Sequence, residues 1–84
     1  MMLYIDRGCT YTEIYEPEHA YIFTGPCLVT RKEQTVTIPS QELFNLRFKE
    51  GMIQELVPSL NASEREFIKT GYSKEGWNQI FNNR

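Results

Sequence analysis

Three residues in the first third of the chain could take part in metal or nucleophilic chemistry: Cys9, His19 and Cys27. A structural zinc site needs four ligands, usually delivered in close pairs such as C-x-x-C, and here no two candidates lie within five residues of each other. Cys9 and His19 could instead form a nucleophile and its base, but no third group stands out that would orient the base. We therefore expect no metal site, no cofactor and no nucleophilic catalysis.

Four carboxylates lie near the N-terminus, at Asp6, Glu13, Glu16 and Glu18. Acid–base chemistry needs two carboxylates held at a fixed separation in a cleft, and a domain this small rarely encloses such a cleft. Charged side chains on strand edges also discourage sheets from pairing edge to edge. We interpret these carboxylates as surface charge and expect that the protein is not an enzyme.

Tyrosines accompany the carboxylates. Tyr11, Glu13 and Tyr15 fall on one face of an alternating stretch, and Tyr4 and Tyr21 lie in neighbouring apolar runs. Tyrosines that point outward often form protein-binding surfaces, because the ring supplies contact area and the hydroxyl supplies direction. We predict that these five residues form a partner-binding surface. The alternative is that half of the tyrosines pack against the second face of the sheet.

A second candidate surface is basic and consists of Arg31, Lys32, Arg47 and Lys49. Basic residues beside aromatic ones are typical of proteins that bind single-stranded nucleic acid. The chain as a whole carries 11 acidic and 9 basic residues, a net charge of −2, whereas nucleic-acid-binding domains are usually basic. Nucleic-acid binding is therefore the alternative hypothesis.

The first half of the chain has the pattern of β-strands, over about residues 2–38. Two runs joined by four polar residues, Arg31 to Gln34, predict a hairpin in which Val36 and Ile38 point into the core. A turn is expected at Gly25-Pro26. The predicted strands cover residues 3–5, 10–15, 21–24, 27–30 and 35–38.

The second half predicts short helices, over about residues 40–82. Ser40 is placed to cap a helix that runs to about residue 50, and a second short helix ends at Pro58. Asn61 and Glu64 fit a capping box for a third helix that Gly71 closes. Ser73 is placed to cap the last helix. Helical spacing assigns four aromatic side chains to the core: Phe44, Phe67, Trp77 and Phe81.

Together these elements predict a single α+β domain over residues 1–84, a small antiparallel sheet packed against three to four short C-terminal helices. No apolar run approaches the roughly 20 residues needed to span a bilayer, and no signal peptide is visible. Two cysteines are fewer than a secreted domain held by disulfides usually has. We expect a cytoplasmic protein with free thiols and no membrane contact.

The C-terminal two-thirds of the chain resembles a group of small uncharacterised proteins encoded by bacteriophages. The resemblance covers residues 27 to 81, and residues 60–71 are its most specific part. Its residues are Gly51-Met52-Ile53-Gln54-Glu55, Val57-Pro58-Ser59-Leu60, Ala62, Arg65-Glu66-Phe67-Ile68, Gly71, Trp77 and Phe81.

Many members of that group look like small zinc ribbons, and the resemblance puts the four ligand positions at Cys27, Thr30, Ser73 and Gly76. Only Cys27 can supply a thiolate, so the resemblance implies a ribbon that has lost its metal. Packing must then replace the metal, and we predict that Cys27 is buried close to Ser73 or Gly76.

These observations favour a non-enzymatic, phage-type accessory protein that binds a host or phage protein in the host-cell cytoplasm. An exposed edge strand would also offer a route to a homodimer. The alternative is a nucleic-acid-binding module, which the zinc-ribbon likeness favours and the acidic charge balance disfavours.

Overall fold

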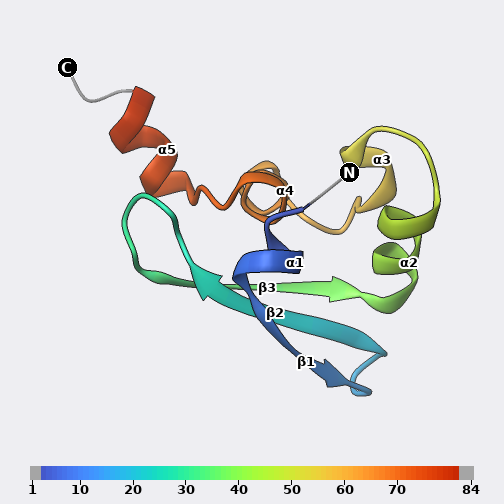
Figure 1. The fold of residues 1–84 in the computed structure, drawn as a ribbon. Coiled ribbons are helices and arrows are strands. Elements are labelled where there is room, and N and C mark those ends of the chain that lie inside the picture. The colour runs from blue at the N-terminus through green and yellow to red at the C-terminus, as the bar shows by residue number, and fades with distance from the viewer. Residues whose placement is uncertain (1–2, 82–84) are drawn as a thin grey trace.

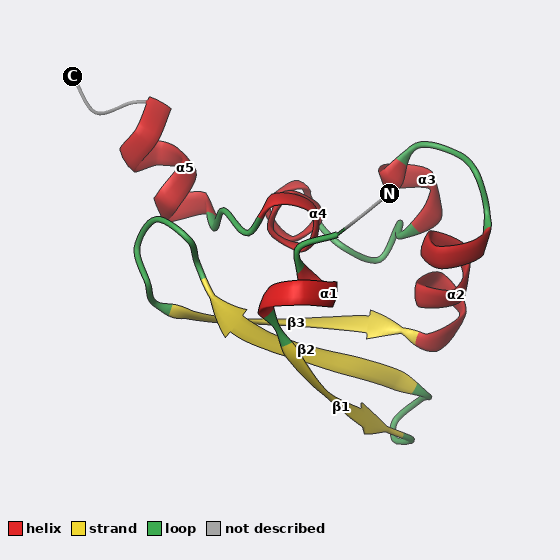
Figure 2. Cartoon of the chain, in the orientation of Figure 1, coloured by secondary structure: helices red, strands yellow, loops and turns green. Residues whose placement is uncertain are grey.

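The computed structural model describes residues 3–81 and shows a three-stranded antiparallel sheet with helices on one side of it (Figure 1). The strand order is β1-β2-β3, so β1 and β3 are the edges. This arrangement confirms the predicted α+β class (Figure 2). In chain order the elements are α1 (Ile5–Gly8), β1 (Thr10–Ile14), β2 (Ala20–Pro26), β3 (Glu33–Pro39), α2 (Ser40–Phe48), α3 (Ile53–Leu56), α4 (Ala62–Thr70) and α5 (Lys74–Phe81).

The register of the sheet determines which side chains share a face. Tyr11 of β1 pairs with Phe23 of β2, and Phe23 pairs with Val36 of β3. Phe23 and Val36 are buried, as is Ile38, so this face carries the core beneath the helices. Because Tyr11 and Glu13 lie on the same face, they extend the core face beyond its buried part.

The sheet departs from the predicted strands at residues 25–32. Gly25 and Pro26 remain in register with β3, opposite Gln34 and Glu33, so β2 runs through the predicted turn. The expected hairpin between residues 27–30 and 35–38 is wrong, because residues 27–32 form the loop that joins β2 to β3. The N–H of Leu28 in this loop donates to the Gly71 carbonyl at 2.9 Å, which ties the loop to the α4–α5 connection.

The predicted first strand is also wrong, because residues 5–8 form the helical turn α1. Leu3, Tyr4 and Ile5 are all buried, and a short apolar run buried on every side cannot be assigned to strand or helix by its periodicity. The Tyr4 N–H donates to the Lys69 carbonyl at 3.2 Å. The segment therefore packs between the sheet and α4 and contributes to the core.

The helices have the predicted N-terminal caps at two of three sites, and Gly71 ends α4 as predicted. The capping box of α4 is present: Asn61 Oδ1 accepts from the Glu64 N–H, and the Asn61 N–H donates to Glu64 Oε1, both at 2.9 Å. Ser73 Oγ accepts from the Gly76 N–H at 3.0 Å and so caps α5. In contrast, α2 starts at Ser40 without a side-chain cap.

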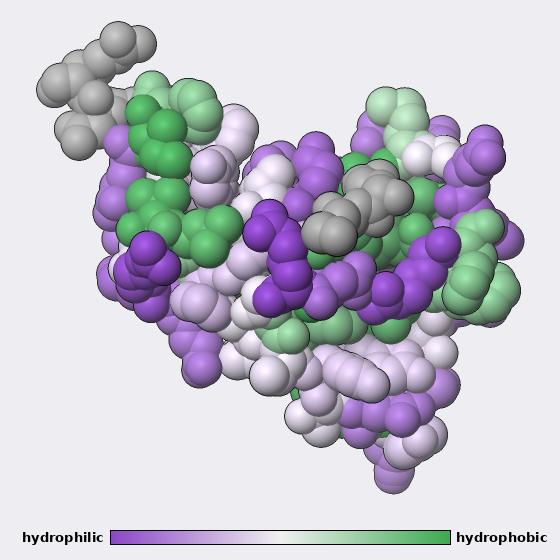
Figure 3. Space-filling model, in the orientation of Figure 1, coloured by the Kyte–Doolittle hydropathy of each residue, from purple (hydrophilic) through white to green (hydrophobic). Residues whose placement is uncertain are grey.

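Three of the four aromatic residues assigned to the core are exposed. Phe67 is 2% exposed, but Trp77 is 40%, Phe44 51% and Phe81 52% exposed. Helix α5 contacts the loop between β2 and β3 through Gly76, whose Cα lies so close to Cys27 and Val29 that a Cβ would clash. The apolar side chains of α5 are exposed to solvent, and Figure 3 shows an apolar patch at the end of the molecule where α5 meets the β2–β3 loop.

Candidate functional site

Of the tyrosines predicted to form a surface, Tyr11 lies on β1, Tyr15 directly after it, and Tyr21 at the start of β2. Tyr11 is 59% and Tyr15 68% exposed. The Tyr11 ring stacks on Phe23, with centroids 5.6 Å apart and planes 20° apart, and lies 5.7 Å from the Tyr21 ring. A groove of about 360 Å³ separates these rings from α1 and α2. The rings are thus supported from below and open to solvent above.

Glu13 lies at the centre of this surface and connects its side chains. Its carboxylate is 2.6 Å from His19 Nε2 and accepts from the Tyr21 hydroxyl at 3.2 Å. Hydrogen bonds from His19, Tyr15 and Tyr21 lower the pKa of Glu13, so it carries a negative charge at neutral pH. The His19 ring in turn stacks on Tyr15, with centroids 5.0 Å apart and planes nearly parallel. His19 belongs to the cluster, although the sequence did not predict it there.

Tyr4 does not belong to this surface. It is 3% exposed and its hydroxyl donates to the Pro26 carbonyl at 2.6 Å. Burial raises the pKa of the Tyr4 hydroxyl, which keeps it protonated as a donor. Its ring packs edge-on against Phe67, with centroids 5.5 Å apart. Tyr4 is a core residue, so its prediction as a partner contact is wrong.

The four residues of the predicted basic patch do not come together. Arg31 and Lys32 lie in the loop before β3, whereas Arg47 and Lys49 lie at the end of α2, so the length of β3 separates the two pairs (Figure 1). Two of the four also have acidic partners: Lys32 Nζ is 3.2 Å from Glu75, and Arg47 is 2.8 Å from Asp6. The structure therefore offers no continuous basic surface to a nucleic acid at these residues.

Cys9, His19 and Cys27 are likewise separated. Cys9 precedes β1 and His19 follows it, so the strand lies between them, and Cys27 lies in the loop after β2. Burial raises the pKa of the Cys9 thiol, which is the wrong direction for a nucleophile at neutral pH. Within residues 3–81, no group of three or more His, Cys, Asp or Glu side chains is placed to hold a metal ion.

Cys27 occupies an unusual environment. Its sulfur is fully buried and accepts hydrogen bonds from the N–H groups of Val29 and Thr30 at 3.4 and 3.5 Å. The N–H and hydroxyl of Ser73 donate to the same sulfur at 3.3 and 3.2 Å. Burial raises the pKa of Cys27, but the hydrogen bonds from Ser73 and Thr30 outweigh it and lower the pKa to about 6.

This geometry confirms that Cys27 is buried against Ser73 and Gly76. A Cβ on Gly76 would lie 2.7 Å from the Cys27 sulfur, so the two segments are in direct contact. Ser73 and Gly76 thus lie against the Cys27 thiol. The chain uses hydrogen bonds and close packing to join the loop after β2 to the start of α5.

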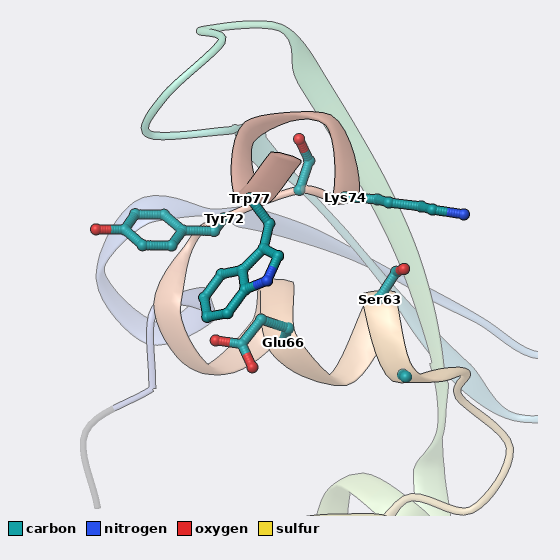
Figure 4. Close-up of a pocket in the computed structure, with 7 residues that line it drawn as sticks. Ser63, Glu66, Tyr72, Lys74 and Trp77 are labelled. Atoms are coloured by element: carbon teal, nitrogen blue, oxygen red, sulfur yellow. The ribbon is translucent and has the colours of Figure 1, made fainter. Parts of the chain in front are cut away.

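A further cavity, which the sequence did not predict, lies between α4 and α5. It has a volume of about 260 Å³ and is lined by Ser63, Glu66, Tyr72, Lys74 and Trp77, among others. Figure 4 shows the indole of Trp77 extending from α5 towards the Glu66 carboxylate on α4, while Lys74 points away. Of the residues that line this cavity, only Trp77 was singled out in the sequence. Its helical spacing assigned it to the core, so the sequence did not predict the cavity.

The comparisons with known proteins give no relative: no family model matches the chain, and neither a curated protein nor a solved structure is significantly similar to it.

Proposed function

We propose that this protein is a non-enzymatic, phage-type accessory protein that binds a host or phage protein through the surface formed by Tyr11, Glu13, Tyr15, His19 and Tyr21, here named the β1 surface. The observation that carries the proposal is that the rings of Tyr11 and Tyr15 are exposed and yet already fixed in position. Tyr11 rests on Phe23, and Tyr15 rests on His19.

Such a surface suits protein binding for two physical reasons. Ordering a side chain on association costs about 0.5–1.5 kcal/mol, and part of this cost is already met for rings held by stacking and hydrogen bonds. Tyrosine is also among the residues that contribute most to binding free energy at protein interfaces. The expected setting is the cytoplasm of the host cell. No helix within residues 3–81 is long and apolar enough to cross a membrane.

The proposal is tested by affinity capture from bacterial lysate, with tagged protein and with or without nuclease. We expect a defined protein that remains after nuclease treatment and that the Tyr11→Ala, Tyr15→Ala double variant loses. Phe48→Ala is the matched control, because Phe48 is 72% exposed and is not among the residues that line the groove beside Tyr11.

Two outcomes would contradict the proposal. If the tyrosine variant captures the same protein as the wild type, the β1 surface is not the contact. If nuclease removes the captured material and the Arg47→Ala, Lys49→Ala variant fails to capture it, the protein binds nucleic acid instead.

A further inference from the structure

Strand β1 has an open edge. It is the outer strand of the sheet, and among the described elements it packs extensively only against β2. None of the backbone hydrogen bonds that the described chain makes outside its helices and strands involves residues 10–14. An antiparallel strand directs only alternate N–H and C=O groups to one neighbour, so the remaining groups of β1 point outward and can pair with another strand.

The charge beside this edge has one sign. Residues 8–30 include Glu13, Glu16 and Glu18 but no lysine or arginine, and all three glutamates are exposed. The nearest cation lining the groove beside Tyr11 is Arg47, and Asp6 pairs with it at 2.8 Å. The open edge therefore attracts positive charge.

From this edge and its charge we propose that β1 binds an extended segment of the partner as a fourth strand, and that the segment carries lysine or arginine at alternate positions. The inference rests on the proposed function and specifies its partner. A basic side chain opposite Glu13 would meet a carboxylate that His19 and Tyr21 already hold in place. Its stem would lie along Tyr11 or Tyr15, where a cation is attracted to the ring face.

A second copy of this chain is a poorer occupant of the same edge. Pairing two β1 strands in register would bring Glu13 of one chain beside Glu13 of the other, at an edge that has no lysine or arginine within residues 8–30 to offset the charge. Like charges on adjacent strands are destabilising, so the edge selects against self-pairing and in favour of a basic strand.

The test uses a blocked heptapeptide, Thr-Lys-Val-Lys-Val-Lys-Thr, and follows the amide signals of residues 10–14 by NMR. Two further peptides carry N-methyl groups on the odd-numbered or on the even-numbered amides. A strand offers only every second N–H to β1, so we expect one methylated peptide to bind like the parent and the other to lose binding. Equal binding by both methylated peptides, or no shift in residues 10–14, would overturn the strand mode.

Charge is tested separately. Replacing the lysines of the peptide by glutamate should weaken binding more than ten-fold, and Glu13→Gln should weaken binding of the lysine peptide by about two- to five-fold, as for an exposed ion pair. Glu50→Gln is the matched control, since Glu50 is exposed between α2 and α3. If the lysine and glutamate peptides bind with equal affinity, the proposal of a basic partner is wrong. It is also wrong if the protein forms a dimer and Glu13→Gln strengthens that dimer.

The two proposals fail in different ways. If no peptide binds but the tyrosine variant still loses a captured protein, the strand mode is wrong and the proposed function stands. If the tyrosine variant loses nothing and no peptide binds, both are wrong.

Discussion

At the scale of single residues, the buried sulfur of Cys27 is stabilised by neutral hydrogen-bond donors rather than by a positively charged side chain. Four donors from Val29, Thr30 and Ser73 surround its sulfur. Hydrogen bonds to the charged form of a group favour that form, so this site stabilises the thiolate even though it is buried. The consequence is a measurable dependence of stability on pH.

We predict that the free energy of unfolding rises between about pH 6 and pH 8.5. The pKa of Cys27 is about 6 in the folded chain, whereas an unfolded cysteine has a pKa of about 8.5. The stabilisation is therefore complete above the unfolded pKa and is lost as the pH falls towards 6, with a slope of at most about 1.4 kcal/mol per pH unit. Urea unfolding at a series of pH values measures it.

The contribution of Cys27 is isolated by comparison with Cys27→Ser, which should remove this slope. Cys9→Ser is the control and should retain most of the slope, because burial raises the pKa of the folded Cys9 thiol and the unfolded thiol ionises only as the pH nears about 8.5. A slope that survives Cys27→Ser would show that other groups are responsible.

At the scale of elements, α5 packs against the loop between β2 and β3 at Gly76. We predict that Gly76→Ala destabilises the fold by about 1–3 kcal/mol, as expected for overpacking, because the new methyl group would lie 2.7 Å from the Cys27 sulfur and 3.0 Å from Val29. Cys27→Ala should also destabilise the fold, but adding Gly76→Ala to it should cost less than in the wild type. A double-mutant cycle by chemical unfolding measures the difference; additive effects would contradict the contact.

The exposed aromatic side chains of α5 give the next prediction. Trp77 contacts Tyr72 and Phe81, with ring centroids 6.2 and 4.3 Å away, but it is 40% exposed. We expect Trp77→Ala to cost about 1 kcal/mol, roughly the value of such ring contacts, and Phe67→Ala to cost about 3–5 kcal/mol. Thermal unfolding of both variants measures the two losses of stability. If Trp77→Ala and Phe67→Ala destabilise the fold equally, α5 packs its apolar side against the core.

Helix α4 shows why its limits were predictable and the orientation of α5 was not. The ends of α4 depend on Asn61, Glu64 and Gly71, which form hydrogen bonds with residues three or four positions away in the chain. The direction in which Trp77 points depends on Gly76 meeting Cys27, a contact between segments far apart in the sequence. Periodicity identifies an apolar face but does not show whether that face is covered.

At the scale of the whole molecule, the N-terminal segment is part of the core, although the sequence predicted a short strand at residues 3–5 and placed Tyr4 on a partner-binding surface. Tyr4 joins β2 to α4 through its hydrogen bonds to Pro26 and Lys69 and its ring contact with Phe67. Leu3 and Ile5 are buried beside it. Residues 3–5 therefore stabilise the sheet and α4 together.

We predict that removing the first eight residues abolishes cooperative unfolding, because a domain of this size has only a few kcal/mol of stability to lose. Tyr4→Phe should keep the fold but cost about 1 kcal/mol, since the Pro26 carbonyl loses its donor. Circular dichroism during heating measures both. A truncated chain that still melts in one sharp transition would show that the segment is dispensable.

The candidate site, like the fold, was only partly predictable from the sequence. The alternation of Tyr11, Glu13 and Tyr15 placed these residues on one strand face, and the structure confirms that placement for Tyr11 and Glu13, while Tyr15 directly follows β1. The sequence could not exclude Tyr4, which has the same residue type and a similar position, nor could it place His19 on the Glu13 carboxylate. Both depend on how distant segments pack.

The α+β class, the inward side of β3 and the capping box of α4 were all predictable from neighbouring residues in the chain. The exposure of most of the aromatic residues, the separation of the basic residues and the open acidic edge of β1 became visible only in the folded molecule. The physical reason is that caps and strand alternation depend on neighbours in the chain, whereas burial and open edges depend on which segments meet in space.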